Sequence, residues 1–323
     1  MARRPPGKEP PAYNGVQHVY FYSTLFPMMQ DVSERFLHFF LQNRGGRLTS
    51  RARKKVGELT EKGLAVRGGC AYDGGMTMRL LCVLAGLWLV AAARACLPEG
   101  CTQAVVGMTE GWDSPQAKVY LVEKDRAGKW QRVLGPVAAR LGRNGAVWGL
   151  GLHTNPVGAV TKKEGDGRTP AGVFRIGGLW TTASTPVKHH RRIPEVRVDA
   201  RDLWVSDPKT PHLYNRYVRL DHPATTAWEL REQMKQNDYA HSIKLQICHN
   251  APDTPGRPVP GAGSSIFFHI WRSGGKYPTA GCTAMGEQNL RAIIARLNPD
   301  RKPVYIMLPR EAYARYRTEW RLP

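Results

Sequence analysis

Short runs in which apolar and polar residues alternate recur along residues 96–323. They are bounded by Gly, Pro, Asn and Asp, which end strands and form turns. The pattern therefore predicts short strands, and the clearest examples are Lys118–Lys124, Trp130–Leu134, Ala146–Leu152, Gly172–Ile176, Tyr217–Leu220, Ile243–Cys248, Ser265–Trp271 and Val304–Leu308.

Helical periodicity is confined to fewer segments. In Gly286–Leu297 the apolar residues recur three and four positions apart, as they do on one face of a helix. Shorter helices are predicted at Ala224–Lys235 and Arg310–Trp320. Strands and helices do not alternate, which argues against a doubly wound parallel sheet. The predicted fold class is mainly β (α+β), a single domain with a few helices.

An uncharged apolar segment, Leu80–Ala93, lies well inside the chain. A positive residue precedes it and Ala-Arg-Ala ends it, which is typical of a secretory signal peptide. The run is too short to span a bilayer comfortably. We therefore interpret 76–95 as a signal peptide, and the alternative interpretation is a buried core helix.

This interpretation divides the chain. Translation would begin at Met76 or Met78, and 1–75 would be either an upstream artefact of a mis-assigned start or a dispensable extension. Residues 96–323 would be the exported domain, located in the periplasm or cell envelope, with no stable membrane insertion after cleavage. Lipidation at Cys96 is a less favoured alternative, because an arginine stands just before the cleavage site.

The net charge of the chain limits the classes of molecule that it is expected to bind. The formal net charge is +21, and +13 of it falls in 96–323. Such a field favours polyanions, namely nucleic acid, an anionic membrane face or a cell-wall polymer. No helix-turn-helix, RNP or zinc-finger pattern is present, and export conflicts with nucleic-acid binding.

Hydrophobic residues make up 42% of the chain, which excludes whole-chain disorder.

One histidine and one cysteine carry the candidate chemistry. His269 lies in a strand-like run, on the face opposite Phe268, and Cys282 follows thirteen residues later, after Gly281. A cysteine between a loop and a helix is near the helix N-terminus, which lowers the thiol pKa, and a nearby histidine can act as its base. The alternative is a buried structural cysteine with a hydrogen-bonded core histidine.

The segment HIWRSGGKYPTAGCTAM, at 269–285, resembles the catalytic motif of the L,D-transpeptidase family (YkuD-like). In that family a His and a Ser/Thr-x-Gly-Cys segment form the active site. Further similar stretches follow the same order at 162–177, 206–218 and 243–271, so the resemblance covers most of 96–308. The Thr-Ala-Gly-Cys sequence indicates the bacterial envelope branch, and the resemblance implies that family's curved mixed β-sheets or β-sandwich with a few peripheral helices.

The resemblance also implies roles for individual residues. Cys282 would be the nucleophile and His269 its proton-transfer partner. The amides of Gly281 and Cys282 would form the oxyanion hole, and Thr279 occupies the Ser/Thr position beside the site.

Two positions depart from the commoner family pattern and affect the expected substrate choice. Ala280 replaces a frequent His, and Ala284 stands where many members have Arg. Arg272 and Lys276, in the loop between the histidine and the cysteine, are candidate substrate-binding cations. The alternative is that both are solvated surface residues.

The implied reaction is acyl transfer on peptidoglycan stem peptides, with loss of D-alanine and transfer to an amine. Hydrolysis, with water as the acceptor, and a non-catalytic wall-binding module are the alternatives. No cofactor is expected, and no metal site, because the histidines lack zinc-site spacing. Cys96 and Cys101 are close enough in sequence for a small disulfide. The sequence does not predict the oligomeric state.

Overall fold

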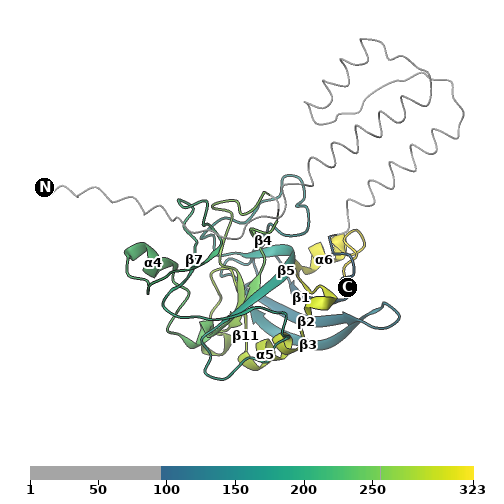
Figure 1. The fold of residues 1–323 in the computed structure, drawn as a ribbon. Coiled ribbons are helices and arrows are strands. Elements are labelled where there is room, and N and C mark those ends of the chain that lie inside the picture. Colours follow the sequence, from purple (N-terminus) through teal and green to yellow (C-terminus); the bar gives the residue numbers. More distant parts are fainter. Residues whose placement is uncertain (1–95, 255) are drawn as a thin grey trace, which may run out of the picture. The chain divides into compact units, whose positions relative to one another are not determined.

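The computed structural model describes residues 96–254 and 256–323 (Figure 1). The predicted upstream extension and signal peptide lie outside these residues. Within them, no helix has the length and apolar character needed to cross a membrane. Cys96 and Cys101 are buried free thiols, so the disulfide that their spacing allows is not formed in this structure.

Most of the described strands belong to one ten-stranded mixed sheet that closes on itself (Figure 1). Its order is β12-β1-β2-β3-β11-β10-β9-β5, and β5 also pairs with β12, which completes a ring. Within the ring, β1–β12 and β10–β11 are parallel. The ring strands are β1 (Gln103–Thr109), β2 (Gln116–Lys124), β3 (Trp130–Arg140), β5 (Thr169–Thr181), β9 (Ile243–Ile247), β10 (Phe267–Ile270), β11 (Thr283–Met285) and β12 (Val304–Pro309).

Four short strands lie beside the ring. Two of them pair in parallel with β5, and the other two form a separate antiparallel sheet. They are β4 (Ala146–Trp148), β6 (Glu195–Arg197), β7 (Asp202–Trp204) and β8 (Tyr217–Arg219). The prediction of a mainly β fold with curved mixed sheets is therefore confirmed, and the closure of the sheet is an additional feature.

Strand β5 is shared between several partners. Its first residues pair with β4, Gly172–Arg175 pair with β12, and its last residues pair with β9. The register with β9 shifts between Ile176 and Leu179, around a pair of glycines. Glycine in a strand favours such an irregularity, which bends the strand and increases its twist. The irregularity coincides with the transfer of β5 from β12 to β9.

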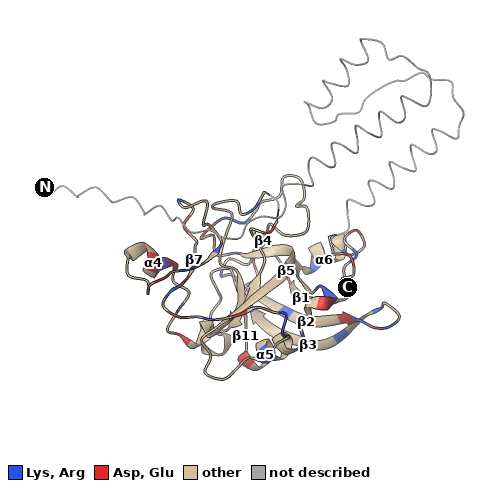
Figure 2. Cartoon of the chain, in the orientation of Figure 1, with Lys and Arg blue, Asp and Glu red and all other residues tan. Residues whose placement is uncertain are grey.

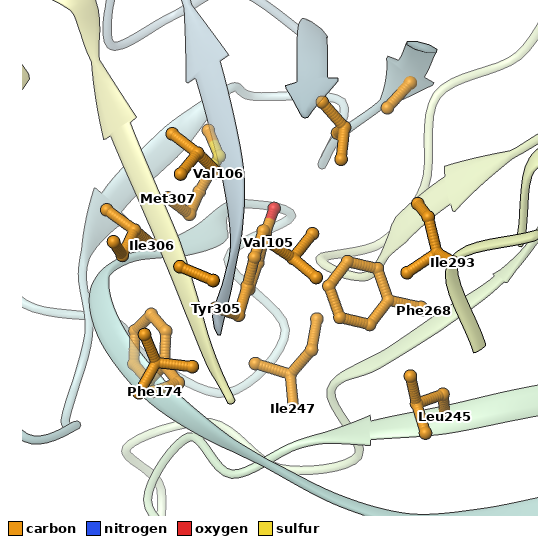
Figure 3. Close-up of a cluster of buried hydrophobic side chains, with 14 of the residues drawn as sticks. Val105, Val106, Phe174, Leu245, Ile247, Phe268, Ile293, Tyr305, Ile306 and Met307 are labelled. Carbon is orange, nitrogen blue, oxygen red and sulfur yellow. The ribbon is translucent and has the colours of Figure 1, made fainter. Parts of the chain in front are cut away.

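Large apolar side chains from different strands form the core (Figure 3). Val105, Phe174, Phe268 and Tyr305 come from β1, β5, β10 and β12, and each is at most 1% exposed. Helix α5 (Glu287–Arg296) covers this core and contributes Ile293, which lies beside Phe268 (Figure 3). Full burial of such a side chain stabilises the fold by roughly 1.5–3 kcal/mol. These contacts anchor β10 on the face opposite the candidate site.

The helices of the described residues are peripheral, as predicted. Besides α5 they are α4 (Ala227–Glu232) and α6 (Arg310–Tyr316), with 3-10 turns η1 (Tyr239–His241), η2 (Ser273–Gly275) and η3 (Pro299–Arg301). Helix α4 begins after Thr226, whose hydroxyl accepts the Glu229 N–H while the Glu229 carboxylate accepts the Thr226 N–H. This capping box fixes the start of the helix.

All eight example strands overlap an observed strand, but their bounds differ. Strand β3 continues to Arg140, and β4 ends at Trp148 instead of Leu152. The three predicted helices are present and shorter than predicted. Four observed strands, β1, β6, β7 and β11, were not among the predicted strands.

Charged residues of both signs are intermixed along the chain (Figure 2). Acidic and basic residues lie close together on the β2–β3 hairpin and on α4 (Figure 2). Some are paired across elements, such as Arg310 with Glu110 and Arg301 with Glu123. The positive charge of the described residues is therefore distributed over several elements.

Candidate active site

Strand pairing brings the predicted histidine and cysteine to one site. Strands β10 and β11 run parallel, with Phe268 opposite Thr283 and His269 opposite Ala284. Cys282 immediately precedes β11, and the Phe267 N–H donates to its Sγ over 3.4 Å. The site is therefore built at the point where two neighbouring strands run side by side.

The face assignment from the sequence agrees with the structure. Phe268 and Ile270 point into the main core, while Phe267 and His269 line a pocket that also contains Cys282. The pocket encloses about 300 Å³. Its titratable lining groups include Lys162, Glu164, Glu232, His241, Lys244, His269 and Cys282.

The expected helix N-terminus is not at the cysteine. Strand β11 separates Cys282 from α5, whose N-cap is Gly286. The prediction was wrong here because Thr283–Met285 pairs with both β10 and β3, which makes it a strand. Burial raises the pKa of the Cys282 thiol, while the Phe267 amide and then Lys244 oppose that rise.

His269 is held in one orientation by the backbone. It is buried, and its Nδ1 lies 2.7 Å from the Ile270 carbonyl oxygen. A carbonyl only accepts, so this contact assigns the proton to Nδ1 and leaves Nε2 as the acceptor. Burial, assisted by the nearby His241, lowers the pKa of His269 to about 4. The imidazole is therefore neutral at pH 7.

Thr279 organises the turn before the cysteine. Its hydroxyl accepts the Gly281 N–H over 3.0 Å and donates to the Cys282 carbonyl over 2.7 Å. A Cβ on Gly281 would lie 3.0 Å from the Arg168 carbonyl oxygen, so a side chain there would crowd the backbone. In this state the Gly281 N–H is already occupied by its hydrogen bond to the Thr279 hydroxyl. Among hydrogen bonds between described residues, none uses the Cys282 N–H.

The two predicted substrate-binding cations lie outside the pocket lining. Arg272 forms an ion pair with Asp238 at 2.5 Å and also contacts His241 Nδ1 at 3.4 Å. Lys276 is exposed, and its Nζ lies 5.5 Å from the centre of the Tyr277 ring. Arg272 thus reaches the site through His241, whereas Lys276 projects from the neighbouring loop.

His241 was not singled out from the sequence. Its ring packs against that of His269, with the ring centres 4.7 Å apart. Its Nδ1 is 2.8 Å from an Asp238 carboxylate oxygen. The pKa of His241 is lowered by burial, and Asp238 opposes that change. The pocket therefore contains two adjacent imidazoles, only one of which has a carboxylate partner in these contacts.

Lys244 was also missed. It is only 5% exposed and lies on β9 directly opposite His269. The available signal was its position in Ile243–Ile247, where Lys244 and Gln246 alternate with apolar residues. Alternation predicts that both polar side chains leave the core, but pattern alone does not identify what they face.

Loop residues support the site from outside. Asn215 donates to the carbonyl oxygens of His249 and Asn250, and its Oδ1 accepts the Ser265 N–H over 3.1 Å. Ser265 in turn presents its carbonyl oxygen to Cys282 Sγ at 3.4 Å. Glu164 accepts hydrogen bonds from Tyr214 and Ser264 on the same wall of the pocket.

The family of the chain is shown by one comparison with known proteins. The model of the L,D-transpeptidase catalytic domain (YkuD) matches residues 112–306. A search of curated proteins found no match. Among solved structures, the chain is similar to Bd1075 of Bdellovibrio bacteriovorus, with 10% identity, a TM-score of 0.32, and coverage of 70% of this chain and 57% of that one. The family match spans more than half of the sequence and contains both His269 and Cys282, and the chain therefore belongs to the L,D-transpeptidase catalytic domain family.

Proposed function

We propose that the protein is an exported L,D-transpeptidase that modifies peptidoglycan stem peptides through a thioester at Cys282. One observation carries the proposal: in a chain of this family, His269 and Cys282 line the same pocket. The net charge of +13 in 96–323 also favours an anionic wall polymer, through a long-range attraction that salt weakens.

The proposed first half-reaction is acylation of the cysteine. The Cys282 thiol gives its proton to His269 Nε2, and Sγ attacks the carbonyl carbon that follows the L-centre of diaminopimelate in a stem tetrapeptide. The C–N bond to the terminal D-alanine then breaks, and His269 returns the proton to the leaving amine. A thioester and free D-alanine result.

The second half-reaction regenerates the enzyme. An amine from a neighbouring stem attacks the thioester carbonyl, His269 accepts its proton, and the C–S bond breaks to release Cys282. In each tetrahedral intermediate, donors directed at the developing oxyanion supply the stabilisation. The Cys282 N–H is the proposed main donor. The Gly281 N–H contributes if its hydrogen bond to Thr279 opens when substrate binds.

Water in place of the amine would give a stem-peptide hydrolase with the same acylation step. A non-catalytic wall-binding module is disfavoured by the free thiol and the oriented imidazole that line one pocket. An amine acceptor gives transfer and a water acceptor gives hydrolysis. The two reactions release different products, so the products distinguish them.

The test is mass spectrometry of tetrapeptide muropeptides incubated with the purified protein, with Cys282→Ala and with Cys248→Ala. Cys248 is a buried thiol outside the pocket and serves as the matched control. Crosslinked dimers in all samples except Cys282→Ala would support transpeptidation. Loss of D-alanine without dimers would support hydrolysis, and absence of both reactions would contradict the proposed substrate.

A further inference from the structure

Lys244 is a buried ammonium without a carboxylate partner. Its side chain is 5% exposed, and its Nζ donates to the Met234 carbonyl oxygen over 2.5 Å. Among the ion pairs of the described residues, none includes Lys244. The other buried lysine of the pocket, Lys162, is paired with Asp166. An unpaired buried ammonium is destabilising, and an anion that formed beside it would offset that cost.

The register of the sheet directs Lys244 toward the reacting groups. Lys244 on β9 is the cross-strand partner of His269 on β10, and directly opposed residues project from the same face of a sheet. Both side chains line the pocket that contains Cys282. The anion that this arrangement can supply is the thiolate of Cys282, which forms when the thiol loses its proton.

The electrostatics of the two groups are reciprocal. Burial lowers the pKa of Lys244 to about 8, and Cys282 is the largest influence opposing that change. Conversely, Lys244 is the charged group that lowers the pKa of the Cys282 thiol most, ahead of Lys162. The lysine and the thiolate therefore stabilise each other's charged forms.

Other charged groups act on the same pocket from the surrounding elements. Asp238 and His241 belong to η1 and its cap, His269 to β10, and Lys162 and Glu164 to the segment before β5. The α4 side contributes Arg231 and Glu232. The carboxylates of Asp238, Glu164 and Glu232 each accept hydrogen bonds from other partners. Among the lysines and arginines of these groups, Lys244 is the one whose described polar contact is to a backbone carbonyl alone.

We propose that Lys244 is a positioning residue whose ammonium stabilises the Cys282 thiolate. It would take the place of the helix N-terminus that was expected to favour the thiolate. The proposal rests on Cys282 being the nucleophile of the proposed function, and it does not depend on the identity of the substrate. It also predicts a pH limit. The stabilisation is present while Lys244 is protonated, and it is lost as the pH rises through about 8.

The test measures thiolate formation directly, without a stem peptide. The full-length protein is alkylated with iodoacetamide from pH 5 to pH 10, and modification of the Cys282 peptide is followed by mass spectrometry. The variant Lys244→Gln removes the charge but keeps a donor for the Met234 carbonyl. Lys244→Met is the second neutral variant, Lys244→Arg restores a cation, and Lys129→Met is a control at an exposed lysine outside the pocket lining.

In Lys244→Gln we expect Cys282 to be alkylated about tenfold more slowly near pH 7, where Lys244 is protonated, and at a rate close to that of the wild type well above pH 8, where Lys244 is neutral. Lys244→Met should show the same loss near pH 7, Lys244→Arg should recover most of the wild-type rate, and Lys129→Met should match wild type. Near-UV circular dichroism verifies folding of each variant. A folded neutral variant with the wild-type profile would overturn the proposal.

The outcome also separates this proposal from the proposed function. A shifted alkylation profile without muropeptide turnover would support the role of Lys244 and reject the peptidoglycan substrate. An unchanged profile in an enzyme that crosslinks muropeptides would reject the role of Lys244 and retain the substrate.

Discussion

The protonation state of the reacting pair follows from where the two side chains lie. Burial raises the pKa of Cys282 and lowers that of His269 to about 4, so a neutral thiol beside a neutral imidazole is favoured at pH 7. Both side chains line one pocket. In the proposed mechanism, proton transfer to Nε2 and the positive charge of Lys244 act together to produce the thiolate.

At the same scale, Thr279 is predicted to hold the turn on which Cys282 lies. Thr279→Val removes the acceptor for the Gly281 N–H and the donor to the Cys282 carbonyl. We expect it to lower the free energy of unfolding by roughly 1–3 kcal/mol. Urea denaturation measures the loss, and Thr279→Ser should retain most of the wild-type stability because it keeps the hydroxyl. Equal stability of the Val and Ser variants would contradict this role.

The sequence located only the residues that are close together in the motif. Cys282, His269 and Thr279 were recognisable because they lie within one segment of characteristic spacing. Lys244 and His241 come from β9 and η1, and they join the site only because β9 pairs with β10. Long-range pairing of this kind leaves no local spacing to recognise.

At the scale of elements, β5 depends on a glycine where it meets β12. Gly172 has φ +136°, and a Cβ there would lie 1.8 Å from the His153 ring. His153 is packed against Trp148, Phe174 and Trp320, so the ring has no room to move. The conformation of the strand and the packing of its neighbour therefore both require glycine.

Gly172→Ala is expected to lower the free energy of unfolding by about 3 kcal/mol or more, because it combines overpacking with an unfavourable φ. The matched control is Gly128→Ala, since Gly128 has φ +76° but no atom within 4 Å of its Cβ position. That change should lower the stability by only about 1–2 kcal/mol. Urea denaturation measures the stability of both variants. Similar midpoints would argue against a steric clash between the new Cβ at position 172 and His153.

Elements with a strong pattern were predictable, and short or shared ones were not. The alternation in β2 and the apolar stripe of α5 each identified an element whose packing agrees with its pattern. Strand β11 has only three residues, all buried, so it offers no alternation to detect. Closure of the ring depends on the simultaneous pairing of β5 with β12 and β9, which local periodicity does not encode.

At the scale of the whole molecule, buried histidines link stability to pH. Burial lowers the pKa values of His153, His249 and His269 to about 4, 3 and 4, respectively. In the unfolded chain each would titrate near pH 6.5. As the pH falls below 6.5 the unfolded state therefore binds protons that the native state does not, and the free energy of unfolding decreases. This stability is fully present above pH 6.5 and is lost toward pH 4.

Urea denaturation at pH 7.5 and pH 5.5 measures this effect, and we expect a lower midpoint at pH 5.5. Each histidine contributes a slope of about 1 kcal/mol per pH unit in the window where only the unfolded state is protonated. His153→Phe removes one titrating ring, so its stability should depend less steeply on pH. A midpoint at pH 5.5 equal to or higher than that at pH 7.5 would contradict the prediction.

The most direct test of the central claim is to trap the acyl-enzyme. The purified protein is mixed with a stem tetrapeptide, quenched in acid, and analysed by intact mass and peptide mapping. We expect a mass increase equal to the acyl part of the stem after loss of D-alanine. The added mass should lie on Cys282, be released by hydroxylamine and be absent from Cys282→Ala. Turnover that persists in Cys282→Ala, or an adduct on another residue, would contradict it.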